Sequence, residues 1–166
     1  LKVGHSTRTV REAIDEGRRE DHTRNALLES RRVDGSLKIY QEFRKEFAKF
    51  LKGEKPGPYV KKRLADQASR RAKYGGTVFV QEPDIKNGVG GLRDYHNILW
   101  MARTRLGVGS LEELVKQEYL SETDAKALER AYDFLLRVRI ELHLQSTRAT
   151  DVLNLEKQPK IAWELG

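Results

Sequence analysis

The sequence predicts a mainly α-helical protein. Apolar side chains recur every three or four residues along most of the chain, which is the spacing of one helix face. Two of these stretches follow a Ser or Thr with a Glu three residues later, the pattern of an N-terminal capping box. Two short segments, residues 1–9 and 77–81, are instead rich in β-branched side chains and favour strands.

In the first third of the chain the predicted elements alternate with polar turns. Residues 1–9 predict a strand, and Thr9 with Glu12 then caps a helix. Residues 25–33 predict a helical start and an extended end, before a turn at Asp34-Gly35. Beyond this turn an aromatic stripe typical of a buried helix face is formed by Tyr40, Phe43, Phe47, Phe50 and Leu51.

The rest of the chain predicts further helices around a glycine-rich segment. Residues 59–74 form a basic helix that Gly75-Gly76 ends. After the glycine-rich residues 82–94, helices are predicted over 95–106, from Ser110 and from Ser121, and a last one begins near Glu156. The helix from Ser121 is the longest, and we expect it to organise the others.

Composition limits the class of protein. The 166 residues suffice for one domain, or one domain with a remnant of its neighbour. No apolar stretch approaches the roughly 20 residues of a membrane span. The absence of cysteine excludes disulfides and thiolate metal sites and favours a reducing compartment. With no secretory signal at the start of the sequence, we expect a cytoplasmic protein.

The positive charge lies in the first half of the chain. The formal net charge is +7, and Lys and Arg outnumber Asp and Glu by 20 to 11 within residues 1–74. Such a surface could face the phosphates of a nucleotide, a nucleic acid or an anionic surface. The alternative is a set of solvated helix faces.

The glycine-rich residues 82–94 are the strongest candidate for a binding site. Three glycines within four positions allow backbone N–H groups to approach a ligand, and a helix begins just after them. Lys86 and Arg93 add a cation on either side, so the segment is suited to phosphate. The alternative is a connecting loop whose Asp84, Arg93 and Asp94 only cap and form ion pairs.

Other arrangements of reactive side chains are sparse. Glu82 and Asp84 would share one face of an extended chain and could hold a divalent cation, although surface ion pairs are the commoner outcome. No zinc-ligand spacing is formed by the histidines, which are His5, His22, His96 and His143. No local motif supports a Ser or Cys nucleophile.

Residues 82–94 resemble the signature EPDIK-x-x-x-GGLRD of the bacterial protein-PII uridylyltransferase/uridylyl-removing enzymes. Four further blocks are similar to that family in the same order: residues 1–9, 28–31, 110–114 and 134–144. Together the five blocks are spread over residues 1–144 of the chain.

The resemblance implies a piece of a multidomain enzyme. In that family a nucleotidyltransferase domain of DNA polymerase beta type uses Mg²⁺ to transfer UMP from UTP to the PII signal protein. A helical domain, an HD phosphohydrolase domain and two ACT domains follow it. Residues 1–36 would be the last strand and helices of the α/β transferase domain, and residues 37–166 most of the helical bundle domain.

The resemblance also implies functional residues. Glu29 is the candidate for a catalytic, metal-binding carboxylate, with Asp21 as the alternative. Nucleotide-binding candidates lie on two segments: His5, Ser6 and Arg8 on the first strand, and Lys86, Gly90, Gly91 and Arg93 on the helical side. We expect Asp94 to act as the N-cap of the following helix.

The transferase superfamily's motif, a Gly-Ser followed by an Asp-x-Asp pair, is absent from the chain. In-line nucleotidyl transfer needs several carboxylates around its metals, so we expect the isolated chain to be inactive and Mg²⁺ to be bound mainly elsewhere. One alternative is a glutamine synthetase adenylyltransferase, because that family carries a related DIK-x-G-x-GG motif. Others are a structural spacer and a basic module for nucleic acid, although aromatics on core faces oppose the latter.

Overall fold

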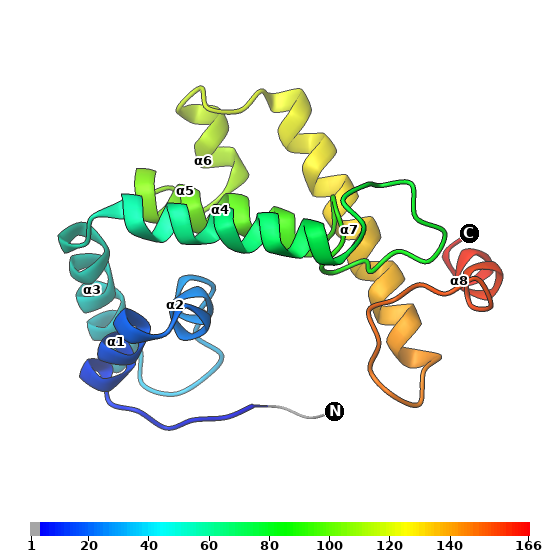
Figure 1. Cartoon of the computed structure of the whole chain (residues 1–166). Helices are drawn as coiled ribbons and strands as arrows, with labels where there is room; N and C mark the ends of the chain where they lie inside the picture. The colour runs from blue at the N-terminus through cyan, green and yellow to red at the C-terminus, as the bar shows by residue number, and fades with distance from the viewer. Residues whose placement is uncertain (1–3) are drawn as a thin grey trace. The chain divides into compact units, whose positions relative to one another are not determined.

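The protein is described here by a computed structural model, which covers residues 4–166. Eight helices, and no strand, form within that range (Figure 1). They divide between two compact units, Leu1–Pro56 and Gly57–Gly166. The predicted mainly helical fold is therefore confirmed for the part of the chain that is described.

The first unit contains α1 (Val10–Arg19), α2 (Asp21–Leu28) and α3 (Leu37–Gly53), and α1 packs on both other helices. The capping box predicted at the start of α1 is present, because the Thr9 side chain accepts from the Glu12 N–H and the Glu12 carboxylate accepts from the Thr9 N–H. The aromatic stripe of α3 is also confirmed. The Phe43 and Phe47 rings stack at 5.6 Å, and Phe47 and Phe50 are buried.

The second unit is organised around α7 (Glu122–Leu144), which contacts α5 (Leu92–Leu106), α6 (Leu111–Lys116) and α8 (Gln158–Leu165). The helix α4 (Pro56–Lys73) precedes them. The side chains of Ser110 and Ser121 cap α6 and α7 as predicted. One core cluster joins α5, α6 and α7 and is formed by Ala102, Val108, Leu111, Leu114 and Ala125. A second is formed by Ile85, Val138, Leu142 and Ile161.

The predicted strands are not found in the described part of the chain. Residues 77–81 form no strand, because no neighbouring strand in the described part of the chain is available to pair with them. Phe79 is accordingly 92% exposed. Residues 4–9 are exposed and belong to no sheet, while residues 1–3 of the same predicted strand lie outside the description. Between residues 4 and 166 the β contact is a single bridge that joins Asp84 to Val152.

The boundary between the compact units differs from the predicted domain boundary. The first unit ends at Pro56, whereas the resemblance places the end of a transferase domain after residue 36. The latter concerns the domains of the longer family members and stays a prediction. None of the described helices is both long and apolar enough to span a membrane.

The two faces of α7 provide a test of the fold. Leu142 is fully buried, whereas Ile140 on the same helix is 57% exposed. We expect Leu142→Ala to lower the free energy of unfolding by about 2–5 kcal/mol, because it leaves a cavity in the core. Ile140→Ala is the matched control and should cost well under half as much. Urea unfolding followed by helical circular dichroism measures both, and equal losses would contradict the assigned faces.

Candidate functional site

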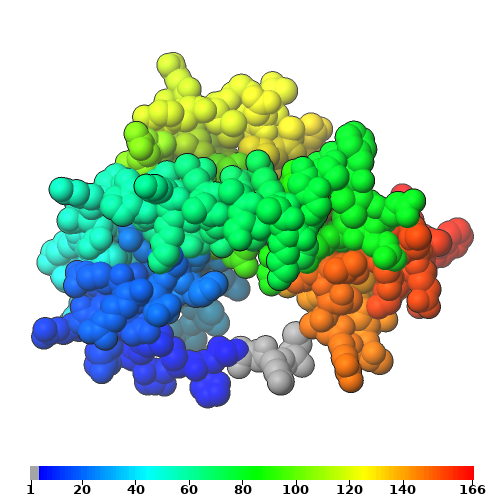
Figure 2. All heavy atoms as spheres, viewed as in Figure 1, coloured from blue at the N-terminus to red at the C-terminus, as the bar shows by residue number. Residues whose placement is uncertain are grey.

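The segment that carries the family signature, residues 82–94 (the signature loop), is anchored to a segment far along the chain. The Ile85 N–H donates to the Asp151 carbonyl at 2.9 Å, and the Leu153 N–H donates to the Pro83 carbonyl at 2.9 Å. The Leu155 N–H donates to the Glu82 carboxylate at 2.9 Å. In Figure 2 the green surface of the loop accordingly adjoins the orange and red surface of the C-terminal residues.

Within the loop, the Asp84 carboxylate organises a turn. It accepts from the backbone N–H groups of Lys86 at 3.0 Å and Asn87 at 2.7 Å, and from the Asn87 side-chain amide at 3.2 Å. Such local bonds are the usual role of Asp in a turn. Glu82 and Asp84, the two carboxylates that could hold a divalent cation, therefore both accept hydrogen bonds from backbone N–H groups. The described residues contain no group of three His, Cys, Asp or Glu side chains that could hold a metal ion.

Three glycines of the loop, Gly88, Gly90 and Gly91, are required by its backbone. A Cβ at Gly88 would lie 2.6 Å from the Asp84 carbonyl oxygen. Gly90 has φ of +74°, in the left-handed region that favours glycine. Gly91 has ordinary dihedral angles but no space, because a Cβ there would lie 2.9–3.0 Å from the carbonyl oxygens of Ile85, Lys86 and Gly88. The glycine content thus reflects close packing of the loop on itself.

The backbone N–H groups that were predicted to cradle a phosphate already have acceptors inside the loop. The bonds are Gly88 N to Asp84 O, Gly90 N to the Asp94 carboxylate, Gly91 N to Gly88 O, Leu92 N to Ile85 O, Arg93 N to Lys86 O and Asp94 N to Gly91 O. Contact between these groups and a phosphate would require the loop to open. A nucleotide-binding role for Gly90 and Gly91 stays a prediction.

Asp94 joins the loop to α4. The residue stands in the first turn of α5, whose N-cap is Gly91, so the prediction that Asp94 is the N-cap is wrong. Its carboxylate instead accepts from Gln67, from Arg70 and from the Gly90 N–H, each at 3.1 Å. Burial alone would raise the pKa of Asp94, but these hydrogen bonds and the Arg70 charge outweigh it and hold the pKa below its usual range.

A second carboxylate, Asp151, joins the loop to α7. Its Oδ1 accepts from Arg139 Nε at 2.7 Å and lies 3.2 Å from His143 Nε2, while its Oδ2 lies 3.5 Å from Lys86 Nζ. Burial would raise the pKa of Asp151, but the Arg139 hydrogen bond and charge, with Lys86 and His143, lower it overall. Asp151 is therefore ionised at neutral pH.

The two predicted cations of the loop have different surroundings. The Lys86 side chain is 33% exposed and has Asp151 as its ion-pair partner. The Arg93 guanidinium lies 5.2 Å from the centre of the Trp100 ring, about two turns further along α5. Both cations belong to a loop whose backbone is fixed, so their positions follow from the packing of the second unit.

The predicted residues of the first unit lie on two segments. His5, Ser6 and Arg8 lie in the exposed stretch before α1. Asp21 is the first residue of α2, and Glu29 is its exposed C-cap. The metal role of Glu29 stays a prediction.

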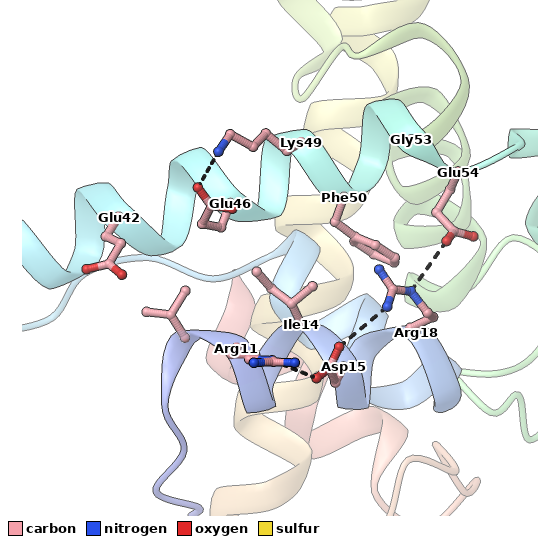
Figure 3. Close-up of a pocket in the computed structure, with 11 residues that line it drawn as sticks. Arg11, Ile14, Asp15, Arg18, Glu42, Glu46, Lys49, Phe50, Gly53 and Glu54 are labelled. Carbon is pink, nitrogen blue, oxygen red and sulfur yellow. Dashed lines mark hydrogen bonds and ion pairs between the residues drawn. The ribbon is translucent and has the colours of Figure 1, made fainter.

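A groove of about 510 Å³ lies between α1 and α3, and it contains none of the predicted site residues (Figure 3). Ile14 and Phe50 form its apolar floor. Arg18 on its wall lies 3.4 Å from Asp15 and 3.6 Å from Glu54, so its positive charge is already paired within the groove.

Sequence reasoning missed the Asp151 cluster, which we define as Lys86, Arg139, His143 and Asp151. Nothing in the local sequence links Asp151 to the loop. The signal that was available is the spacing of Arg139 and His143, which lie four residues apart and so face the same side of α7. A pair of potential cations on one helix face indicates an anionic partner.

The comparisons with known proteins identify the family. The model of the family described as GlnD PII-uridylyltransferase matches residues 59–166. A bifunctional uridylyltransferase/uridylyl-removing enzyme from Rhodospirillum rubrum is 38% identical over the whole chain, and one from Caulobacter vibrioides is 33% identical over the whole chain. No solved structure matches. The chain belongs to the GlnD PII-uridylyltransferase family, and it spans 18% of the length of these relatives.

Gly90 and Gly91 should respond differently to substitution by alanine. We expect Gly91→Ala to destabilise the second unit strongly, because three carbonyl oxygens must move to admit the methyl group. Gly90→Ala has open space around it and should cost only about 1–2 kcal/mol for its left-handed conformation. Urea unfolding and limited proteolysis of the loop measure the difference. An effect of Gly90→Ala as large as that of Gly91→Ala would contradict the packing described.

The lowered pKa of Asp94 predicts a pH dependence of stability. A carboxyl group with a lowered folded pKa stabilises the protein above its ordinary pKa, and this contribution is lost as pH falls through the folded value. We expect Asp94→Asn to be less stable than the wild type at about pH 7, and the difference to shrink below about pH 4. Urea unfolding across this pH range tests it, and a difference independent of pH would overturn it.

Proposed function

We propose that this chain is part of a bifunctional enzyme that transfers UMP from UTP to a PII signal protein and removes it again, in the cytoplasm. The observation that carries the proposal is the match of the whole chain to relatives of that name, with the signature loop as its most recognisable motif. Because the chain spans 18% of those relatives, the remaining machinery would belong to other parts of the enzyme. The isolated chain would then be inactive.

The role we propose for the signature loop is to present cations to the nucleotide. Its backbone is fixed at both ends, by Asp94 toward α4 and by Asp151 toward α7. Lys86 and Arg93 are the cations of this fixed loop, and such groups bind the oxygens of a triphosphate well. The loop would therefore supply charge at a set position, with its glycines permitting the compact backbone.

We further propose that His5, Ser6 and Arg8 bind the nucleotide. The described residues do not form a complete Mg²⁺ site, because they contain no group of three His, Cys, Asp or Glu side chains that could hold a metal ion. We therefore propose that Mg²⁺ is bound mainly by residues outside this chain, with Glu29 as a single contributing ligand. No step of the chemistry is assigned to the chain alone.

Two variants test the cations of the loop in the full-length enzyme that carries this chain. We expect Lys86→Ala and Arg93→Ala each to lower kcat/KM for UMP transfer to PII by roughly 10- to 100-fold, because a hydrogen bond to a charged group contributes about 1.5–3 kcal/mol. Transfer of radiolabelled UMP from UTP measures the effect, and thermal unfolding verifies that the variants fold.

Lys126→Ala is the matched control. Lys126 is an exposed lysine of α7, 2.7 Å from Glu122, and lies outside the loop, so its loss should leave transfer unchanged. The isolated 166-residue chain is the negative control. Wild-type transfer rates in both folded loop variants would refute the role given to the loop, and absence of UMP transfer by the unmodified full-length enzyme would refute the proposed function itself.

A further inference from the structure

We infer that Asp151 is a positioning residue for UMP transfer, which acts through Lys86 by holding its ammonium group at a fixed place beside the signature loop. The inference rests on the proposed function, in which Lys86 contacts the triphosphate of the nucleotide. It adds a residue, and a way of acting, that the signature of the loop does not contain.

The first step of the argument is that the Asp151 carboxylate is itself held firmly. Arg139 Nε donates to Oδ1 at 2.7 Å, the short distance of a charge-assisted hydrogen bond. His143 Nε2 lies 3.2 Å from the same oxygen, and because an ionised carboxylate only accepts, this nitrogen carries the proton. Both donors come from α7, the longest helix of the second unit. Oδ1 is therefore fixed by a rigid element.

The second step is that the other oxygen of Asp151 is left for Lys86. Oδ2 lies 3.5 Å from Lys86 Nζ, which is longer than a normal charge-assisted hydrogen bond. The carboxylate side chain is 18% exposed and the lysine side chain 33%, so water screens this attraction only in part. Asp151 thus attracts the ammonium group without occupying its three N–H donors, which remain able to bind a second anion.

The third step is that Asp151 fixes the backbone beneath the same lysine. Its carbonyl oxygen accepts from the Ile85 N–H at 2.9 Å, directly before Lys86 in the chain. The adjoining bridge between Asp84 and Val152 continues this attachment. One residue therefore holds both the base and the tip of the Lys86 side chain, and this limits the rotamers that the lysine can adopt.

The fourth step is the charge of the Asp151 cluster. Lys86 and Arg139 carry two positive charges against the single negative charge of Asp151, so the cluster keeps an excess of positive charge at a partly exposed place. A triphosphate that approached Lys86 would meet an attractive potential. The carboxylate sets the direction of the lysine without cancelling that potential.

A double-mutant cycle in the full-length enzyme tests the inference, with radiolabelled UTP as the probe. We expect Asp151→Asn to lower kcat/KM for UMP transfer about tenfold, because the neutral amide no longer orients Lys86. In a Lys86→Ala background the same change should have no further effect beyond about twofold, since there is no lysine left to position. A residue with a purely structural role would instead lower kcat/KM by the same factor in both backgrounds.

Asp94→Asn is the matched control. Asp94 also anchors the signature loop, but its hydrogen bonds are to Gln67, Arg70 and Gly90 and not to Lys86. Its effect should be the same with and without Lys86. Arg139→Gln is a second variant, for the case that Asp151→Asn does not fold, and it should likewise have no effect once Lys86 is absent.

The outcomes separate the inference from the function on which it rests. Coupling of Asp151 to Lys86 without coupling of Asp94 supports the inference. Equal factors in both backgrounds, or no effect of Asp151→Asn, overturn it while UMP transfer by the wild type leaves the proposed function standing. An inactive wild-type enzyme overturns the proposed function, and the inference falls with it.

Discussion

The need of every backbone N–H group for an acceptor governs the signature loop and, through it, the second unit. A compact loop between helices has little access to water, so its donors must be satisfied within the protein. Here the loop's carbonyl groups and the carboxylates of Asp84 and Asp94 accept them. The glycines follow from this requirement, since side chains at Gly88 and Gly91 would strike the accepting carbonyl oxygens. The backbone of the loop therefore serves to hold its own structure, and only its side chains are available to contact a ligand.

The sequence predicted the helices well because their signals are local. Capping residues such as Thr9, Ser110 and Ser121 act within one turn of themselves, and apolar stripes report a helix face directly. The sequence could not decide the role of the glycines, for the opposite reason. A loop that offers its N–H groups to a phosphate and one that consumes them itself have the same composition, and only the position of acceptors such as Asp94 distinguishes the two.

The candidate site was predicted only where its partners are close in sequence. Lys86 and Arg93 could be identified from the loop, but the carboxylate that holds Lys86 is contributed by a segment beyond α7. Residues 77–81 show the same limit, because β-propensity creates no strand without a neighbour. In the first unit, Glu29 and its alternative Asp21 were named from the resemblance alone, because the sequence around them has no local pattern of metal ligands.

The attachment of the loop to residues 151–155 has a consequence for how the protein is made. The Leu155 N–H and its acceptor Glu82 are 73 residues apart in the chain, so the loop cannot be completed until the ribosome has released α7 and the segment beyond it. Contacts of such sequence separation form late, after local helices. During synthesis α4 and α5 would exist with an unfinished connection between them. A nascent chain stalled before residue 151 would thus carry the family's most recognisable motif in a state that has not yet acquired its structure.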